Sequence, residues 1–337
     1  MPKKIIALTG GAGYIGSHLA ICLFNQGYQP LIIDNFANSN QNIIKKLEAI
    51  VNQKLPMYQI DINDREKINN VFKNNKIDAV IHLAAHKSIP ESFEKPLDYY
   101  NNNINGLINT LFAMNIGNCN KIIFSSSCSV YSEKAEIPIT ENSKLEGNNP
   151  YSKSKIICEE ILEQISKSDE SFKYVSLRYF NPVGAHSSGI IGDRLDGKNS
   201  SLMSKICKIA SCQNDHLTIF GNDYDTVDGT CIRDFIHIND LIAGHINALD
   251  NLSNLDEIPY INLGTGKGYS VLELIKTFER VNNVKVLYKF ANRRGGDLEK
   301  IYADVTLANK ILNWQAKENL ESMCSSSWNN AKTQIIL

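Results

Sequence analysis

Short apolar runs alternate with longer amphipathic stretches along the first half of the chain. The apolar runs, which predict buried strands, are Ile5–Thr9, Leu31–Asp34, Met57–Ile60, Ala79–Leu83 and Lys121–Ser125. The stretches with helical spacing are Tyr14–Gln26, Ser39–Val51, Asp64–Asn74 and Leu97–Asn115. This alternation predicts an α/β fold with a parallel sheet, and such nearly all-apolar strands need helices on both faces of that sheet.

The alternation of predicted strands and helices ends after one more apolar strand, Tyr174–Arg178. Residues 181–231 are rich in Gly, Ser, Asp and Asn, with one clear helix near Leu202–Ser211. A strand-like run at Asp234–Ile238 and a helix at Asp240–Leu249 then restore the earlier pattern. We therefore expect two domains that are interleaved in sequence: 1–180 with about 233–263, and a smaller mixed α/β lobe of about 181–232 and 264–337.

Length and composition support this division. A chain of 337 residues exceeds what one compact core usually holds, and 43% apolar with 21% charged residues is ordinary for a globular protein. The net charge of −1 gives no reason to expect nucleic acid or an anionic membrane as a partner. No apolar stretch approaches the ~18 residues of a membrane helix, and the start of the chain does not resemble a signal peptide.

The eight cysteines are scattered, without a Cys-x-x-Cys pair, and the seven histidines are equally dispersed. This pattern favours reduced thiols in a cytoplasmic protein over a disulfide framework, and it predicts no metal site.

A glycine-rich segment, Thr9 to Gly16, follows the first predicted strand and opens the first predicted helix. Gly10, Gly13 and Gly16 permit a tight turn and a close approach of pyrophosphate, while helix residues such as Tyr14 and Ile15 offer backbone N–H groups. Asp34 ends the second strand about 20 residues later, where a carboxylate binds the adenosine ribose of NAD and repels the phosphate of NADP. These features predict a Rossmann-type doubly wound fold that binds NAD; the alternative is a structural glycine turn.

Two further segments follow predicted strands. Asp61 and Ile62 lie where the adenine edge would be, although Asp61 could equally cap the helix that starts near Asp64. The small residues of Leu83-Ala84-Ala85 fit either close passage of the cofactor or tight core packing.

Tyr151 and Lys155 are four residues apart at the start of a predicted helix that runs to about Lys167. This spacing places both on one helical face, where the lysine ammonium and a positive nicotinamide ring would favour the phenolate. Ser127 ends the fifth strand segment and could relay a proton to the tyrosine. The alternatives are a surface helix and, for the neighbouring serines, turn chemistry; Cys128 is expected to be a small packed residue.

With these elements the chain resembles the extended short-chain dehydrogenase/reductase superfamily over nearly its whole length. Further segments narrow the resemblance: Tyr99-Tyr100, Asn102-Asn103, Arg178 to His186, Phe220 to Tyr224, Asp228 to Thr230, Arg233 to His237, and Arg293-Arg294-Gly295-Gly296-Asp297. With these segments the chain resembles the UDP-glucose 4-epimerase family.

The resemblance implies an isomerase of galactose metabolism that interconverts UDP-glucose and UDP-galactose. Hydride passes from sugar C4 to tightly bound NAD, giving a 4-keto sugar, and returns to its other face. Tyr151 would be the acid and base, Ser127 the relay, and Lys155 the residue that holds the nicotinamide ribose. A homodimer is implied too, through the helices near Leu97–Asn115 and Tyr151–Lys167.

The resemblance also assigns binding residues. The further cofactor positions are Asn35, Phe36, Asn38, Ser39, Lys87, Asn102 and Phe180. The substrate positions are Lys87, Ser127, Tyr151, Phe180, Asn181, Ser201, Leu202, Thr218, Phe220, Arg233, Arg294, Asp297 and Ile301. Among them, the two arginines would clamp the diphosphate, Asp297 would take a ribose hydroxyl, and Thr218–Phe220 would bracket the uracil. Without the resemblance, each arginine would be interpreted as a surface ion-pair partner.

Three positions depart from the family pattern. Ser201 stands where Asn is frequent, and Ser132 follows Tyr131 where Gly is usual. Ile301 lines the far end of the sugar pocket, with a side chain smaller than Tyr and larger than Cys. The sequence therefore leaves open whether N-acetylated UDP-sugars are accepted.

Three other functions compete with epimerisation. A sugar-nucleotide 4,6-dehydratase needs an Asp-Glu pair beside the serine, where this chain has Cys128 and Ser129. A plain dehydrogenase would release NADH at each turnover. A non-catalytic NAD-sensing protein is expected to lack a working tyrosine, whereas Tyr151, Lys155 and Ser127 are all present here.

Overall fold

The structure is a computed structural model, and it describes residues 3–196, 200–212, 215–255, 259–295 and 297–336. Gly296, part of one family-like segment, lies outside these residues. The chain forms two compact units. Unit 1 comprises Met1–Ser132, Lys144–Arg178 and His245–Ile261, and unit 2 comprises Glu133–Ser143, Tyr179–Gly244 and Asn262–Leu337. That these units bind cofactor and substrate respectively stays a prediction.

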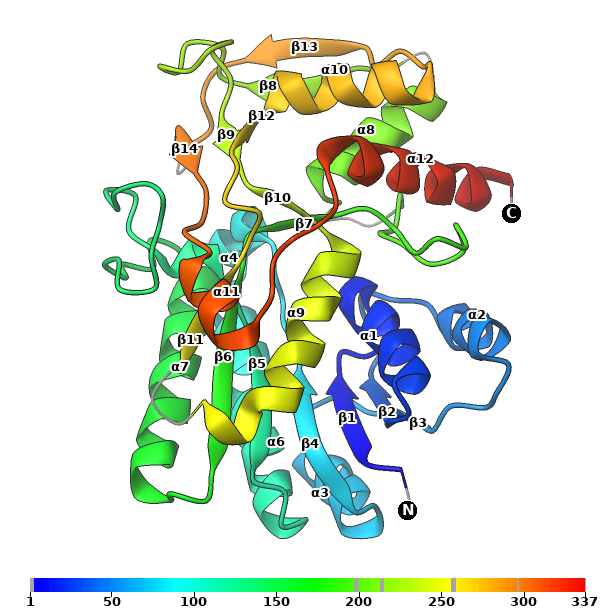
Figure 1. Ribbon diagram of the computed structural model, residues 1–337, viewed down its shortest axis with the longest axis vertical. Coiled ribbons are helices and arrows are strands. Elements are labelled where there is room, and N and C mark those ends of the chain that lie inside the picture. The colour runs from blue at the N-terminus through cyan, green and yellow to red at the C-terminus, as the bar shows by residue number, and fades with distance from the viewer. Residues whose placement is uncertain (1–2, 197–199, 213–214, 256–258, 296, 337) are drawn as a thin grey trace. The chain divides into compact units, whose positions relative to one another are not determined.

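Unit 1 is built on a seven-stranded sheet with the order β11-β6-β5-β4-β1-β2-β3 (Figure 1). Its strands are β1 (Ile5–Thr9), β2 (Gln29–Asp34), β3 (Met57–Gln59), β4 (Ile77–His82), β5 (Lys121–Ser127), β6 (Lys173–Tyr179) and β11 (Tyr260–Leu263). The pairs β1–β2, β1–β4, β2–β3 and β4–β5 are parallel. This order reverses direction beside β1, which is the topological switch point of a doubly wound fold and confirms the predicted fold class.

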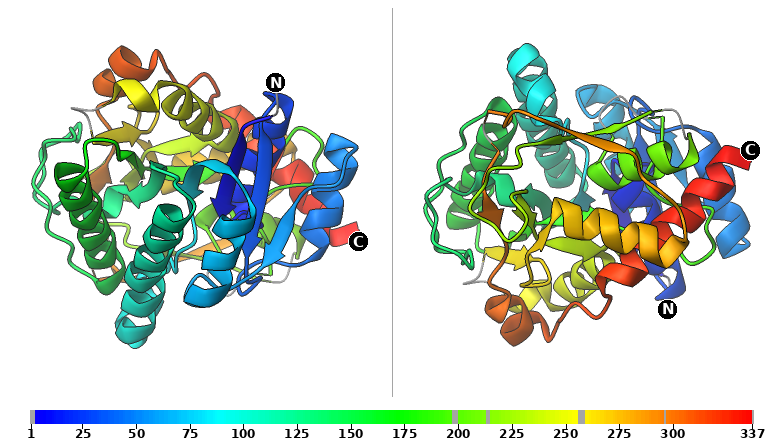
Figure 2. Two further views of the ribbon diagram at one scale, coloured as in Figure 1. Left: turned by 90° about the horizontal axis from the view of Figure 1, so that it is seen from below. Right: turned by 90° about the horizontal axis from the view of Figure 1, so that it is seen from above.

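Helices cover both faces of this sheet (Figure 2). Those of unit 1 are α1 (Tyr14–Asn25), α2 (Asn42–Val51), α3 (Arg65–Asn74), α4 (Ile89–Glu94), α5 (Pro96–Tyr100), α6 (Gly106–Ile116) and α7 (Pro150–Ser168). The helix α1 packs on α2, and α3 packs on α6. Buried apolar side chains from the strands and from α3, α6 and α7, including Ile33, Val80, Phe124 and Leu162, form one core cluster.

Two predicted helices differ in detail from the observed ones. The stretch from Ser39 becomes helical only at Asn42, because the Asn40 side chain accepts a hydrogen bond from the Asn42 N–H at 2.9 Å and forms a turn. The stretch Leu97–Asn115 is helical throughout but contains a π-helical segment, Asn101–Asn105, between α5 and α6. Such segments occur at functional sites more often than elsewhere.

Among its described residues, unit 2 has three small sheets around a second core. Its strands are β7 (Asn181–Val183), β8 (Leu217–Phe220), β9 (Ile232–Arg233), β10 (Phe235–His237), β12 (Tyr269–Ser270), β13 (Tyr288–Ala291) and β14 (Lys300–Ile301). Its helices are α8 (Leu202–Ser211), α10 (Val271–Asn282), α11 (Thr306–Leu312) and α12 (Leu320–Ile336). The core joins α8, α10 and α12 through buried residues such as Ile206, Phe278 and Met323. The helix α9 (Ile238–Asn251) has residues in both units.

Within the residues that the structure describes, no helix is long and apolar enough to cross a membrane.

Candidate active site

The glycine-rich segment forms the turn between β1 and α1. Gly10 has a φ of 70°, and a Cβ there would lie 2.8 Å from the Ala84 nitrogen. A Cβ at Gly16 would lie 2.4 Å from the Gly10 carbonyl oxygen. Gly13 precedes α1, whose first residues are Tyr14 and Ile15, and no side chain among the described residues caps this helix. The segment therefore exposes backbone at a helix start, as an anion-binding loop requires.

Asp34 organises the loop after β2. One carboxylate oxygen accepts the N–H of Ala12 in the glycine turn at 3.0 Å. The other accepts the N–H of Phe36 at 2.8 Å and the hydroxyl of Ser39 at 3.1 Å. Phe36 has a φ of 61°, an uncommon value for a side chain with a Cβ. These contacts place Asp34 beside the glycine turn and bring Phe36 and Ser39 to its carboxylate. Asn38, also predicted to bind the cofactor, is exposed.

Asp61 is not the cap of α3. The carboxylate of Asp64 accepts the Lys67 N–H at 3.1 Å and caps that helix. Asp61 instead accepts the N–H of Asn63 at 2.8 Å and the side-chain amide of Asn35 at 2.9 Å. Asn35 and Asp61 are thus brought together, while Ile62 is buried against Gly106.

The segment after β4 lies beside the glycine turn. The Leu83 N–H donates to the Thr9 carbonyl at 3.0 Å, and Ala84 and Ala85 are partly buried. Lys87 is exposed, and Asn102 donates to the Asn103 side chain at 3.0 Å.

Buried Asn103 anchors this segment to α7. Its side-chain oxygen accepts the His86 N–H at 2.8 Å, and its amide donates to the Ser154 hydroxyl at 2.9 Å. It is a positioning residue that the sequence analysis noted only as part of a family-like segment.

The helix α7 begins with a capping box. The Asn149 side chain accepts the Ser152 N–H at 2.8 Å, the Ser152 hydroxyl bonds back to Asn149, and Pro150 occupies the first helical turn. Tyr151 and Lys155 follow at helical spacing, one turn apart, so the cap fixes where both side chains start.

Lys155 is 3% exposed, and its ammonium donates to the Ser125 carbonyl at 2.6 Å. Its Nζ also lies 4.7 Å from the centre of the Phe124 ring. Burial lowers the pKa of Lys155 to about 8, although Cys158 and Glu159 oppose this fall. The lysine is therefore a buried cation at neutral pH that loses its proton in mildly alkaline solution.

Burial raises the pKa of Tyr151 to about 12, and the side chain of Ser127, which lies close to the phenol, opposes this rise. The Ser127 hydroxyl also accepts the Ser129 N–H at 3.2 Å, which fixes its direction. The structure thus brings Tyr151, Lys155 and Ser127 together at the carboxyl end of β5.

A buried ion pair behind these residues was missed by the sequence analysis. Arg178 of β6 and Glu159 of α7 have side chains 1% and 2% exposed, and their closest atoms are 2.7 Å apart. The only sequence signal was the position of Glu159 one helical turn after Lys155.

In unit 2, Asp297 lies between two arginines. Its carboxylate is 2.7 Å from Nη2 of Arg294 and 3.8 Å from Nη2 of Arg233. Arg233 is largely buried and donates to the carbonyls of Ile232 and Leu298 at 2.9 and 2.7 Å. The Arg294 guanidinium is half-exposed, 5.4 Å from the centre of the Phe220 ring. The structure therefore brings Phe220, Arg233, Arg294 and Asp297 into one cluster, which we call the arginine cluster.

Other predicted substrate residues of unit 2 are spread around its small sheets. Ile301 of β14 pairs with Arg233 of β9 and is 6% exposed. The Asn181 N–H donates to the Asp234 carbonyl at 2.9 Å, and its side-chain oxygen is buried without a hydrogen-bond partner among the described residues. Phe180 is buried, and its N–H donates to the Leu263 carbonyl at 3.1 Å. Thr218 is partly buried in β8.

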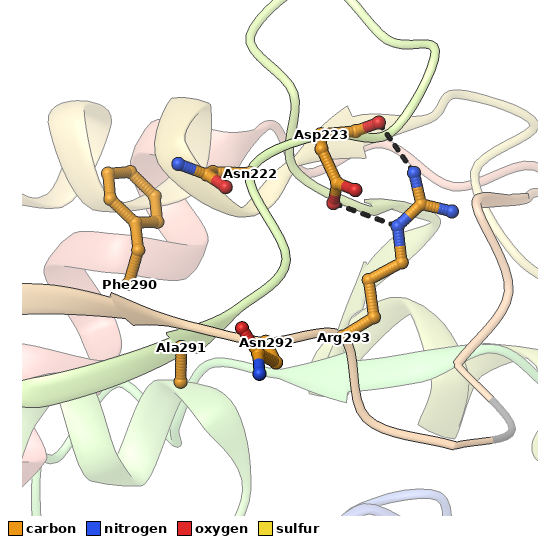
Figure 3. Close-up of a pocket in the computed structure, with 6 residues that line it drawn as sticks. All are labelled: Asn222, Asp223, Phe290, Ala291, Asn292 and Arg293. Carbon is orange, nitrogen blue, oxygen red and sulfur yellow. Dashed lines mark hydrogen bonds and ion pairs between the residues drawn. The ribbon is translucent and has the colours of Figure 1, made fainter.

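Unit 2 also has a surface pocket (Figure 3). Its lining residues are Asn222, Asp223, Phe290, Ala291, Asn292 and Arg293. Arg293 donates to the Asp223 carboxylate at 2.8 Å and to the Asp223 carbonyl at 2.5 Å. None of the predicted site residues lines this pocket.

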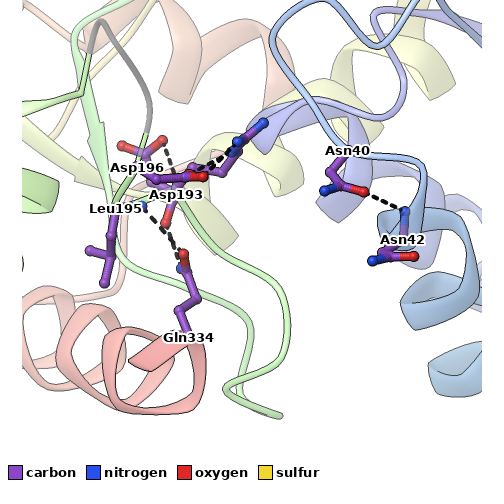
Figure 4. Close-up of polar contacts among 7 residues, drawn as sticks. Asn40, Asn42, Asp193, Leu195, Asp196 and Gln334 are labelled. Atoms are coloured by element: carbon purple, nitrogen blue, oxygen red, sulfur yellow. Dashed lines mark hydrogen bonds and ion pairs between the residues drawn. The ribbon is translucent and has the colours of Figure 1, made fainter. Parts of the chain in front are cut away.

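Ser201 caps α8, directly before Leu202. Its hydroxyl accepts the Ser204 N–H at 3.2 Å, and the Ser204 hydroxyl donates to the Asp193 carboxylate at 2.7 Å. The Gln334 amide in turn donates to the Asp193 carbonyl at 2.8 Å (Figure 4). In this structure Ser201 thus has a helix-capping role.

Comparison with known proteins identifies the family. A family model described as GDP-mannose 4,6 dehydratase matches residues 8–327. UDP-glucose 4-epimerase of Bacillus subtilis (strain 168) is 44% identical over 323 residues, covering 96% of this chain and 95% of that protein. The chain belongs to the UDP-glucose 4-epimerase family.

Solved structures of family members agree with this result. One is UDP-glucose-4-epimerase from Stenotrophomonas maltophila with bound NAD and formylated UDP-arabinopyranose, with a TM-score of 0.95, 37% identity and 99% of each chain covered. Another is UDP-glucose 4-epimerase from Bifidobacterium longum with NAD+ and UDP, with a TM-score of 0.93, 39% identity, and 98% of this chain and 99% of that chain covered. The resemblance stated from the sequence is confirmed; the roles of individual residues stay predictions.

Proposed function

We propose that this chain interconverts UDP-glucose and UDP-galactose by epimerisation at C4 of the sugar, with NAD as a retained cofactor. The observation that carries the proposal is the grouping of Tyr151, Ser127 and buried Lys155 at the edge of the sheet that also holds the glycine turn. In a parallel sheet the carboxyl ends of β1, β4 and β5 share one edge, where dinucleotides bind.

The residues of unit 1 fit NAD. Gly10 and Gly16 leave a cradle that a Cβ would fill, and the uncapped start of α1 offers N–H groups to a pyrophosphate. The Asp34 carboxylate lies beside this turn, where it would accept the adenosine ribose hydroxyls. Asn35, Phe36, Ser39 and the Asp61 segment surround that end of the loop, as the sequence analysis expects of cofactor-binding residues.

NAD, when bound, supplies the hydride acceptor and donor at sugar C4. Tyr151 removes the proton of the 4-hydroxyl and later returns it, with Ser127 hydrogen-bonded to the same position. A phenol whose pKa is raised to about 12 stays almost wholly protonated at neutral pH, so a cation nearby is needed to favour the phenolate that takes the proton. Buried Lys155, one helical turn away, would provide that cation and would hold the nicotinamide ribose.

The arginine cluster of unit 2 supports the UDP part of the proposal. Arg233 and Arg294 are suited to a diphosphate, because a guanidinium donates two parallel hydrogen bonds. Asp297 pairs with both arginines and would accept a ribose hydroxyl. Phe220 and Thr218 lie on β8, from which backbone groups would bind the uracil, and partly buried Asn181 has a side-chain oxygen without a hydrogen-bond partner among the described residues.

The family model that matches this chain is named for a dehydratase, but the residues beside Ser127 favour epimerisation. Dehydration needs a second acid and base to remove water from the sugar. The two following residues are Cys128 and Ser129, and neither is a carboxylic acid. The names of the relatives agree with this choice.

We further propose a homodimer formed through the helical side of unit 1. Leu97, Phe112 and Ile116 on α5 and α6, two of the helical segments expected at the interface, are 79%, 45% and 39% exposed, so each leaves a large apolar side chain open to a partner. A monomer by light scattering would contradict this proposal. A cytoplasmic location is proposed too, since none of the eight cysteines forms a disulfide in the structure.

The test of the catalytic proposal is turnover of UDP-galactose by the wild type and by Tyr151→Phe. The wild type should form UDP-glucose without added NAD, and Tyr151→Phe should lose about 10²- to 10⁴-fold in kcat because it lacks the acid–base hydroxyl. Equal turnover by the two proteins would overturn the assignment of Tyr151.

A further inference from the structure

The buried ion pair of Glu159 and Arg178 contacts the chain both before and after Ser127, which is one of the proposed catalytic residues. One Glu159 oxygen accepts Nε of Arg178 at 3.0 Å and the hydroxyl of Ser126 at 2.6 Å. The other accepts Nη2 of Arg178 at 2.7 Å. A two-pronged pair of this kind fixes direction as well as distance.

Three consecutive residues of β5 contact three consecutive turns of α7. The Ser127 side chain lies close to that of Tyr151, the Ser125 carbonyl accepts from Lys155, and the Ser126 hydroxyl donates to Glu159. Glu159 therefore makes the third attachment between the strand that carries Ser127 and the helix that carries Tyr151.

Arg178 extends the attachment to the far side of Ser127. Its Nη1 donates to the Tyr131 hydroxyl at 3.1 Å, four residues after Ser127. Its guanidinium also lies 5.0 and 4.3 Å from the ring centres of Tyr131 and Tyr260. The segment that holds Ser127 is thus fixed both before and after that residue.

A buried ion pair is a poor way to gain stability, because removing two charges from water offsets their attraction. Apolar side chains of similar size would fill this space with less desolvation. The retention of two buried charges therefore points to a role in placing other groups.

The charge of Glu159 also faces Lys155. Side chains four residues apart on a helix are neighbours, and the Glu159 carboxylate favours the ammonium form of Lys155. The other titratable groups around Lys155 are Tyr151 and Cys158 on α7 and His82 on β4; burial and the Lys155 charge lower the pKa of His82 to about 3, so it is neutral. Arg178 faces Glu159 from β6.

We propose that Glu159 and Arg178 are positioning residues for the epimerase reaction: they hold Ser127 against Tyr151 and keep a carboxylate beside Lys155. This proposal rests on the function proposed above. It predicts that the pair affects turnover and its pH dependence, and not only stability.

The test compares Glu159→Gln with Glu160→Gln, which removes the same charge from the exposed side of the same helix. Glu159→Gln should lower kcat at least about tenfold, with the KM for UDP-galactose within about twofold, because misplaced groups lose transition-state contacts. The alkaline limb of its pH–kcat profile, which is the fall of kcat at high pH, should move about one pH unit lower. The lost carboxylate and the unpaired charge of Arg178 both disfavour the Lys155 ammonium. Glu160→Gln should match the wild type in all three.

The double variant Glu159→Gln/Arg178→Met removes both charges. Its alkaline limb should lie between those of the wild type and Glu159→Gln. A Glu159→Gln enzyme with lower stability to urea but unchanged kcat and an unchanged limb would overturn the proposal, because the pair would then be merely structural.

Two further measurements keep the test decisive. If Glu159→Gln does not fold, Arg178→Lys takes its place, because it retains the positive charge but loses the planar guanidinium. This variant should have a lower kcat and an unchanged alkaline limb. A kcat equal to that of the wild type would overturn the proposal. If the wild type fails to interconvert the sugars, the proposed function fails. A crystal structure of Glu159→Gln then decides on positioning: it should show Ser127 displaced from Tyr151, and an unchanged arrangement of these two side chains would overturn the proposal.

Discussion

Replacing Lys155 by Met tests whether burial of the lysine ammonium lowers the free energy of unfolding. The side chain is 3% exposed, and burial lowers its pKa from 10.5 to about 8. The folded chain thus binds this proton less tightly than the unfolded chain. Met has a similar length and no charge, so the substitution removes the titration with little change of shape.

The size of the effect follows from the shift in pKa. A fall from 10.5 to about 8 corresponds to roughly 3 kcal/mol of destabilisation when both states are protonated. Because the folded pKa is lowered, the full penalty applies below pH 8 and disappears as pH rises to about 10.5. Relative to the wild type, Lys155→Met should therefore be roughly 2 to 3 kcal/mol more stable at pH 7 than it is at pH 10.

The assay is urea unfolding of nucleotide-free protein at several pH values between 7 and 10. Nucleotide must be removed because a ligand that binds only the folded state adds to stability. The absolute difference at any one pH also contains the bond to the Ser125 carbonyl, whose loss costs about 1 to 3 kcal/mol, so the change with pH is the quantity to compare.

The matched control is Lys153→Met, which removes the same charge from an exposed position of α7. Its stability relative to the wild type should stay flat over this pH range. An equally flat result for Lys155→Met would refute the reasoning, since it would mean that burial does not penalise the ammonium.

Four further outcomes are expected. Gly16→Ala should retain no NAD, measured as nucleotide released on denaturation, because the added Cβ lies 2.4 Å from the Gly10 carbonyl oxygen. Arg294→Leu should raise the KM for UDP-galactose at least about tenfold with kcat within about twofold, as steady-state kinetics would show, because it loses charged hydrogen bonds made equally throughout the reaction. Ile301→Ala should raise kcat/KM for UDP-N-acetylgalactosamine relative to UDP-galactose in a competition assay, because the substitution shortens a 6% exposed side chain. In the wild type, kcat should fall above about pH 8 in a pH–rate profile as Lys155 loses its proton.

Each of these outcomes has a control or a contradicting result. Gly295→Ala, where an added Cβ meets nothing within 4 Å, should keep its NAD. Arg280→Leu, which removes an exposed arginine from α10, should leave the KM unchanged. An unaltered sugar preference in Ile301→Ala would exclude this residue as the size determinant. A kcat that stays constant to pH 10 would contradict the proposed role of the Lys155 ammonium.

The sheet of unit 1 was predictable because its signals are local. An apolar run followed by glycines and an amphipathic stretch specifies β1, the turn and α1 without any distant contact. Helix α2 shows the limit of this approach. The spacing predicted a start at Ser39, but the Asn40 side chain bonds to the Asn42 backbone and delays the helix.

The strands of unit 2 could not be predicted in the same way. Strands β9 and β14 have two residues each, and they exist because Ile232 and Arg233 pair with Lys300 and Ile301 far along the chain. Two residues are too few to show alternation of apolar and polar side chains.

The residues of the candidate site also differ in whether local spacing or a tertiary contact brings them together. Tyr151 and Lys155 are one helical turn apart, so their spacing alone predicted that they share a face. Glu159 and Arg178 come from a helix and a strand, and nothing in their spacing shows that both are buried. The tie between Asp297 and the two arginines is likewise a tertiary contact.

The central claim is that the bound cofactor is a retained catalyst for sugar epimerisation. The direct measurement is to mix the purified wild-type protein with UDP-galactose, without added NAD, and to identify the products by NMR. The account predicts catalytic conversion to UDP-glucose until the two sugars reach equilibrium, with no free NADH. Loss of water from the sugar, or release of NADH in proportion to turnover, would contradict it.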